Sequence, residues 1–475
     1  MNILAIDQGT SATKALLVGP GQHVLGTGEV PVRQHAAGEA IEVDPEDLLS
    51  SVLAAGQAAI AAARTPADAV ALANQGETVL AWDRQTGRPL TRAISWQDRR
   101  SAAVCARLAG HAERLADITG LPLDPYFAAP KMTWLRENYT ESGVVTTTDA
   151  WLLARLGADY VTDAATASRT MLLDLDTVEW SDEACAVFGI DRCSLPSVAD
   201  CAGTVGETAA FGRPMPVAGL AVDQQAALVA ERCFAAGQAK CTYGTGAFLL
   251  ATTGERAVRS SAGLSASVAW RVPGGTAYCL DGQVYTAGAA ISWLIDTGIL
   301  TDPGELDAVG GTVSDGGGAT FVPALAGLGA PHWRPDARGA FLGLTLGVSR
   351  AHLIRAVIDG LAASVALLAR SVAHDLRAPL TALRVDGGLT RSAVLMQAQA
   401  DLLQAPVEVC RVPDATALGV AALAQLGLGA ATSLADAVGP ADIERVVQPQ
   451  MSADQAAQRL AEFEAAVDLV AGTGR

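Results

Sequence analysis

Signatures of several common protein classes are absent from this 475-residue sequence. The eight cysteines form no CxxC pair and the six histidines show no metal-ligand spacing, so the cysteines are expected to be reduced, buried, apolar side chains. There is no GxxxxGK[ST] phosphate loop, no Gly-rich loop of the protein-kinase pattern and no GxSxG elbow. These absences exclude the two common phosphate-binding architectures and an α/β serine hydrolase.

Positive charge is also scarce, because 33 Lys and Arg stand against 50 Asp and Glu, which gives a net charge of −17. Such an acidic chain is a poor partner for nucleic acid or an anionic membrane. An acidic residue follows Met1 within six residues, so no signal peptide is expected. Residues 415–435 are uncharged but rich in alanine and broken by glycines, which predicts a buried helix and a turn. We therefore expect a cytoplasmic protein with neither a nucleic-acid nor a membrane partner.

The sequence is rich in apolar residues arranged in alternating strand and helix patterns. Half of its residues are hydrophobic and 17% are charged, which is enough for large cores and excludes a disordered chain. Strands are expected at 69–73, 79–82, 217–222 and 383–385, and helices at 45–63, 98–115, 350–374 and 452–470. This alternation is typical of α/β proteins.

Two stretches resemble each other at a separation of about half the chain. An apolar strand ends in Asp7-Gln8-Gly9-Thr10, and a second strand follows at 14–18. Tyr243-Gly244-Thr245-Gly246 is likewise followed by an apolar strand at 247–251. We interpret them as one β-hairpin design at the head of two halves, residues 1–230 and 231–475, joined by a packed hinge near 225–240.

Four clusters carry groups suited to phosphate chemistry. Asp7 with the turn after it offers a carboxylate for a metal and N–H groups for an anion, and the turn at 243–246 has the same character. Asp386-Gly387-Gly388 lets a flat nucleotide lie against the chain, and Asp223 stands where a strand meets a helix, a place for a general base. Each cluster also fits an ordinary role, as a turn or, for Asp223, as a helix N-cap. From the residues alone, this is a two-part α/β protein whose turns could hold phosphates between its halves.

Longer motifs occur along the chain in a constant order: Trp96-Gln97-Asp98-Arg99-Arg100, residues 120–127, 223–228, 242–246, 327–333 and 339–344. Together they resemble the FGGY carbohydrate-kinase family, most closely its glycerol-kinase branch, from about residue 3 to about residue 430. The resemblance implies an α/β fold of two ribonuclease-H-like (actin-like ATPase) domains around a central nucleotide cleft. Residues 1–230 would bind the acceptor, a small polyol or sugar, and residues 231–475 would bind the nucleotide. It also implies that ATP and Mg²⁺ are bound. Assembly into a homo-oligomer, as a dimer or a tetramer, is left open.

The resemblance also implies roles for individual residues. Asp7 matches the Mg²⁺-associated carboxylate, and Asp223 matches the catalytic base. The positions implied for nucleotide and phosphate are Gly9, Thr10, Ser11, Lys14, Thr245, Gly288, Ser292, Gly388 and Ser392. The positions implied for the acceptor are Gly76, Glu77, Trp96, Tyr126, Asp223, Gln224 and Phe248.

The activity implied by the resemblance is in-line transfer of phosphate from ATP to a primary hydroxyl, most simply from glycerol to glycerol 3-phosphate. Gly76 stands where the branch usually has an arginine, so a kinase of a larger polyol or ketose (erythritol, threitol, xylitol, xylulose) is an alternative. Lys14 also replaces a usual arginine. Ser292 and Ser392 replace the usual glutamine and asparagine at the adenine, which leaves the strictness of ATP preference open. A catalytically silent nucleotide-binding switch is a third hypothesis, which the intact Asp7 and Asp223 oppose.

Overall fold

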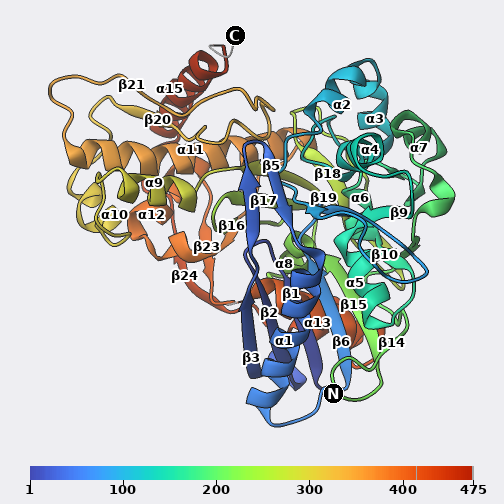
Figure 1. Ribbon diagram of the computed structural model, residues 1–475. Coiled ribbons are helices and arrows are strands. Elements are labelled where there is room, and N and C mark those ends of the chain that lie inside the picture. Colours follow the sequence, from blue (N-terminus) through green and yellow to red (C-terminus); the bar gives the residue numbers. More distant parts are fainter. Residues whose placement is uncertain (413, 473–475) are drawn as a thin grey trace.

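The computed structural model describes residues 1–412 and 414–472, with its two largest sheets in successive parts of the chain (Figure 1). The first sheet has six strands in the order β14-β15-β6-β1-β2-β3. They are β14 (Glu207–Thr208), β15 (Met215–Val222), β6 (Ala69–Asn74), β1 (Ile3–Gln8), β2 (Ala12–Val18) and β3 (Val24–Pro31). Strands β15, β6 and β1 are parallel, whereas β2 and β3 continue antiparallel from β1. The carboxyl ends of the three parallel strands therefore meet at one edge, where open α/β sheets bind ligands.

The second sheet repeats this plan with seven strands in the order β18-β19-β17-β16-β22-β23-β24. They are β18 (Ser265–Val272), β19 (Gly275–Val284), β17 (Ala247–Gly254), β16 (Ala239–Tyr243), β22 (Leu383–Asp386), β23 (Val407–Cys410) and β24 (Ile443–Val447). Strands β16 and β17 form a hairpin, and β22 runs parallel beside β16 as β6 runs beside β1. The expected α/β construction is confirmed, and both hairpins lie where the sequence predicts them.

Two helices cover the first sheet, one from each end of the sequence. Helix α1 (Pro45–Ala63) has the predicted bounds, because the Asp44 carboxylate accepts the N–H of Glu46, proline occupies the first turn, and Arg64 ends the helix in a left-handed conformation. Helix α13 (Ala415–Gly427) shares one apolar core with residues of β1, β6 and β15. It also packs against α8 (Asp223–Ala230), the helix that follows β15. A segment from the end of the chain thus completes the core of the first sheet (Figure 1).

Three helices of the second half were predicted from the sequence: α11 (Arg350–Leu376), α15 (Ala453–Gly472) and the helix α13 already described. The structure adds α9 (Gly288–Asp296), α10 (Glu305–Ala308), α12 (Ala393–Leu403) and α14 (Leu434–Val438), which the sequence analysis did not predict. Helix α11 is long and apolar enough to cross a membrane by length and composition, but 72% of its most apolar window is buried inside the protein. It belongs to the apolar core that includes residues of β16, β17 and β22.

A smaller module is formed by two strands that precede α1 and by most of the segment between β6 and β15. Its sheet has the order β4-β5-β8-β7-β9, formed by β4 (Gln34–Ala37), β5 (Ala40–Val43), β8 (Ala93–Ile94), β7 (Val79–Trp82) and β9 (Val144–Thr147). The helices of the module are α2 (Ala102–Arg107), α3 (Ala112–Thr119), α4 (Ala128–Asn138), α5 (Thr148–Leu156), α6 (Ala164–Ser168) and α7 (Asp182–Phe188). Strand β7 follows β6 after a short turn, so the module is anchored at the ligand-binding edge of the first sheet.

Two local predictions were wrong. The helix expected at 98–115 is interrupted, because the buried Asp98 carboxylate accepts N–H groups from Ile41 and Arg100 and holds its segment as a turn before α2. A 3-10 turn at Ala109–His111 then separates α2 from α3. The cysteines are also not uniformly buried, because Cys193 is exposed and Cys410 is half-buried.

Candidate active site

Three carboxylates follow the neighbouring parallel strands of the first sheet. Asp7 lies near the end of β1, Glu77 just beyond β6, and Asp223 just beyond β15. Asp223 is not the helix N-cap, the ordinary role that the sequence left open beside that of a base, because Val222 occupies that position and Asp223 is the first residue of α8. The Asp223 carboxylate accepts the backbone N–H of Gln224 at 2.7 Å. Its location is therefore fixed by the strand-to-helix junction.

The first hairpin gathers like charges around Asp7. Residues Asp7 and Lys14 are paired across β1 and β2, and the Lys14 ammonium contacts the Asp414 carboxylate at 3.1 Å. Burial, together with the negative charges of Asp223 and Asp414, raises the pKa of Asp7 to about 8 although Lys14 opposes the shift. Burial raises the pKa of Asp223 as well. Because Asp7 and Asp223 are costly to ionise together, the Asp7 carboxylate is suited to a hard divalent cation such as Mg²⁺, whose charge offsets their repulsion.

A small cavity brings together most of the positions that the sequence predicts for the acceptor. Glu77, Tyr126, Asp223, Gln224 and Phe248 all line it. Its volume of about 20 Å³ has room for one or two water molecules, so an acceptor enters only if the walls separate slightly.

Trp96 connects this cavity to the first hairpin. Its ring lies edge-on to Tyr126 and Phe248, with centroids 5.7 and 6.2 Å apart. Its indole N–H donates to the Thr10 hydroxyl at 3.0 Å. The acceptor wall and the expected phosphate turn at 9–11 are thus joined by one side chain.

Gly76 does not provide the extra space that its lack of a side chain predicts. It is absent from the cavity lining, whereas its neighbour Glu77 and the packed Val222 are part of it. A Cβ atom added at Gly76 would lie 2.9 Å from a methyl group of Val222. The volume expected in place of an arginine side chain is therefore occupied at its base by Val222.

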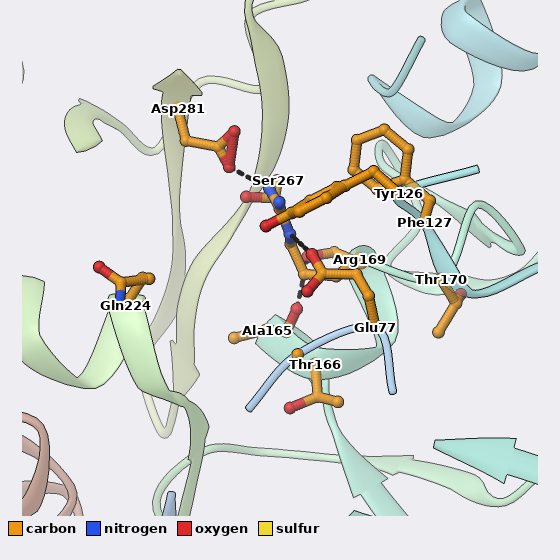
Figure 2. Close-up of polar contacts among 12 residues, drawn as sticks. Glu77, Tyr126, Phe127, Ala165, Thr166, Arg169, Thr170, Gln224, Ser267 and Asp281 are labelled. Carbon is orange, nitrogen blue, oxygen red and sulfur yellow. Dashed lines mark hydrogen bonds and ion pairs between the residues drawn. The ribbon is translucent and has the colours of Figure 1, made fainter. Parts of the chain in front are cut away.

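A guanidinium reaches the cavity from another element, at the residue after α6. Arg169 is buried and donates to the Glu77 carboxylate at 2.6 Å and to the Asp281 carboxylate (Figure 2). It also lies over the rings of Tyr126 and Phe127, 5.7 and 5.3 Å from their centroids. Glu77 itself has a left-handed backbone with φ of 59°, a strained conformation of the kind that clusters at functional sites.

The expected nucleotide positions line a second, larger cavity of about 780 Å³ in the other half. Thr245, Gly288, Ser292, Gly388 and Ser392 all belong to its walls. The turn at 9–11 and Lys14 are not among its lining residues. The structure thus gathers five of the nine expected nucleotide and phosphate positions in one cavity and leaves the other four on the first hairpin.

Two features of this larger cavity come from close packing. A Cβ atom at Gly288 would lie 2.6 Å from the Gly244 carbonyl, so glycine lets α9 start against the second hairpin. The Ser392 hydroxyl bonds to the Asp307 carboxylate and accepts the Leu395 N–H, which caps α12. Ser392 therefore has a structural role in addition to lining the cavity.

Sequence reasoning did not single out Arg169, Asp281 or Gln283, although all three line the acceptor cavity. Arg169 follows a short helix and carries no motif. The other two were detectable in principle, because they are polar residues at alternate positions of the otherwise apolar end of β19. Such a pattern indicates that one face of the strand lines a polar cavity or contacts a polar ligand.

Comparison with known proteins agrees with this architecture. Residues 2–230 match the N-terminal domain of the FGGY family of carbohydrate kinases, and residues 239–428 match its C-terminal domain. A glycerol kinase of Bordetella parapertussis is 42% identical over 496 residues, covering 100% of this chain and 98% of that protein. A glycerol kinase of Thermus brockianus is 44% identical over 446 residues, covering 90% of each chain. The crystal structure of Plasmodium falciparum glycerol kinase with ADP is 30% identical, with a TM-score of 0.92 over 99% of this chain and 98% of that one.

Proposed function

The chain belongs to the FGGY family of carbohydrate kinases, and from this premise we propose that it transfers phosphate from ATP to glycerol, forming glycerol 3-phosphate. The full-length relatives described above are glycerol kinases. The observation that carries the proposal is the placement of Asp223 at the start of α8, in the same small cavity as Glu77, Tyr126 and Gln224.

The geometry supports a general-base mechanism. Burial raises the pKa of Asp223, which makes the carboxylate a better proton acceptor near neutral pH. We expect Asp223 to take the proton of the primary hydroxyl while that oxygen attacks the γ-phosphate of ATP in line. Trp96 holds the Thr10 turn beside the acceptor, and the N–H groups of this turn would stabilise charge on the phosphate.

The side chains around Asp7 fit a magnesium ion. Asp7 would hold the ion, whose charge offsets that of the ATP phosphates and of the nearby Asp223 when it is bound. Among the residues that the structure describes, no group of three or more His, Cys, Asp or Glu side chains is arranged to hold a metal ion. One carboxylate with ATP oxygens nevertheless satisfies Mg²⁺, which commonly binds through one or two carboxylates and substrate phosphates.

Replacement of the base tests the proposed function. Asp223→Asn keeps the shape and should lower kcat by roughly 10²–10⁴-fold, measured as ADP release with glycerol at saturation. Thermal unfolding should shift little, because the amide oxygen of the substituted side chain can still accept the Gln224 N–H. More than about a tenth of the wild-type turnover in this variant would place the base elsewhere.

Removal of divalent metal tests the role of Asp7. Activity should be lost with a chelator and restored by added Mg²⁺, because a polyanion otherwise faces the Asp7 and Asp223 carboxylates without compensation. Asp7→Asn should raise the Mg²⁺ concentration needed for half-maximal rate. Full turnover in metal-free buffer would contradict this assignment.

The larger-acceptor hypothesis loses the observation that favoured it, since Val222 packs where the extra space was expected. We therefore expect kcat/KM for glycerol to exceed that for erythritol, threitol, xylitol and xylulose. A preference for any of these larger acceptors would restore the alternative.

A further inference from the structure

One wall of the acceptor cavity comes from the second half of the chain. Strand β19 contributes Asp281 and Gln283, which lie two residues apart on the same face of the strand and both line the cavity. Both are buried, with exposures of 6% and 2%. None of the residues considered so far for the acceptor, except Phe248, comes from this half.

Each of these side chains carries a buried polar atom without a hydrogen-bond partner in residues 1–412 and 414–472. The atoms are Asp281 Oδ1 and Gln283 Nε2. The hydroxyls of Ser265 and Tyr285 lie near these side chains but make no hydrogen bond to either atom. A buried polar group left unpaired costs roughly 1–3 kcal/mol, so native proteins rarely keep one without a reason. The adjoining cavity supplies that reason, because a ligand hydroxyl can donate to a carboxylate oxygen and accept from an amide N–H.

The orientation of Asp281 is fixed by Arg169. Its Oδ2 atom accepts from Arg169, whose Nε donates to Glu77 in the first half (Figure 2). One guanidinium therefore holds a carboxylate from each side of the cavity. This leaves Oδ1 as the Asp281 oxygen available to a ligand.

We propose that Asp281 and Gln283 form a subsite for a hydroxyl of the acceptor other than the one that reacts. This rests on the proposed function, in which Asp223 already takes the proton of the reacting hydroxyl. The subsite belongs to the second half and Asp223 to the first. The acceptor can therefore bind to both only when the two halves of the chain are in contact. The subsite thus couples acceptor affinity to their approach.

The decisive experiment removes the side-chain donor and a ligand hydroxyl in turn. Gln283→Leu has similar bulk but cannot donate, and should raise the KM for glycerol roughly three- to tenfold with kcat within about twofold. The substrates compared are glycerol, 1,2-propanediol, which lacks one terminal hydroxyl, and 1,3-propanediol, which lacks the central one. The KM for one diol should be unchanged by Gln283→Leu, because the hydroxyl that Gln283 binds is already missing. Equal effects on all three substrates, or none, would overturn the subsite.

A second variant tests the carboxylate. Asp281→Asn should raise the glycerol KM roughly ten- to a hundredfold, since hydrogen bonds to charged groups are the stronger ones. The matched control is Asp200→Asn, which removes the contact to Arg271 at 2.6 Å, a pair of residues that lies outside the cavity lining. The control should keep the wild-type KM, and an unchanged KM in Asp281→Asn would contradict the proposal.

Different results would overturn the proposed kinase activity and the proposed subsite. If the wild-type protein phosphorylates none of the polyols, the proposed function is wrong. If it phosphorylates glycerol but Gln283→Leu binds and turns over all three substrates as the wild type does, only the subsite is wrong. Should Asp281→Asn unfold at a lower temperature than Asp200→Asn, the Gln283→Leu series alone decides.

Discussion

The Asp7 side chain, which we expect to bind the metal, lowers the stability of the ligand-free folded protein. Its pKa rises from 3.8 to about 8 because of burial and the nearby charges of Asp223 and Asp414. A carboxyl group with a raised pKa in the folded state binds a proton more tightly there than in the unfolded chain. The folded state therefore loses stability as pH rises from about 4 to about 8, and the loss is constant above that range.

We expect Asp7→Asn to stabilise the ligand-free protein, by an amount that grows over the same pH range. Near pH 4 the variant and the wild type should unfold at similar temperatures, whereas at pH 8.5 the variant should unfold several degrees higher. Thermal unfolding in chelator at several pH values measures this. A difference that does not depend on pH would show that Asp7 titrates normally.

Gly76 leads to a second prediction at the scale of one residue. A Cβ atom there would lie 2.9 Å from a Val222 methyl group, so Gly76→Arg should lower the free energy of unfolding by roughly 1–3 kcal/mol. The glycerol KM should not improve. Urea unfolding checks the first outcome, and the double variant Gly76→Arg, Val222→Ala should recover part of the stability. A Gly76→Arg protein as stable as the wild type, with tighter glycerol binding, would revive the enlarged-pocket idea.

At the scale of elements, the contact between α8 and α13 positions the proposed base. A Cβ atom at Gly419 of α13 would lie 1.8 Å from the backbone carbonyl of Ala226 in α8. The Thr416 hydroxyl also donates to the Asp223 carbonyl at 3.3 Å. The two helices can therefore approach this closely only with glycine at 419.

Gly419→Ala should push α8 away from α13 and so displace Asp223. We expect the free energy of unfolding to fall by at least about 1–3 kcal/mol, and kcat to fall while the glycerol KM changes less. The control is Gly110→Ala, where nothing lies within 4 Å of an added Cβ atom. Wild-type stability and kcat in Gly419→Ala would mean that the helices tolerate separation.

The sequence predicts elements better than it predicts which of them meet. Both hairpins, α1 and α11 were predictable because their patterns are local: strand periodicity, a capping Asp44 and a continuous apolar helix face. The contact of α13 with the first sheet has no local signal, since it joins segments that are about two hundred to four hundred residues apart. The same holds for Arg169, whose partners Glu77 and Asp281 lie 92 and 112 residues away in the sequence. These long-range contacts explain why the sequence points to the strand-end carboxylates but not to the β19 wall.

At the scale of the whole molecule, the boundary near residue 230 does not separate two complete cores. One core combines residues of β1, β6 and β15 with α13 and with β17, β18 and β19. A fragment of residues 1–230 would therefore expose the sheet face that α13 covers. We expect this fragment to bind a hydrophobic dye and to aggregate, and coexpression with residues 231–475 to restore activity. A monomeric fragment 1–230 with a cooperative thermal transition would contradict this expectation.

The packing of α13 on the first sheet also determines how long this sheet stays incomplete during translation. Strand β15 ends at Val222 and α13 ends at Gly427, so the ribosome adds about two hundred residues between them. At roughly 5–20 residues per second, the nascent first sheet waits about 10–40 s for its missing helix. Its apolar, alanine-rich face is open to chaperones, and to neighbouring nascent chains, throughout that interval. Slowing translation after residue 230 should thus lower the soluble yield more than slowing it before that point.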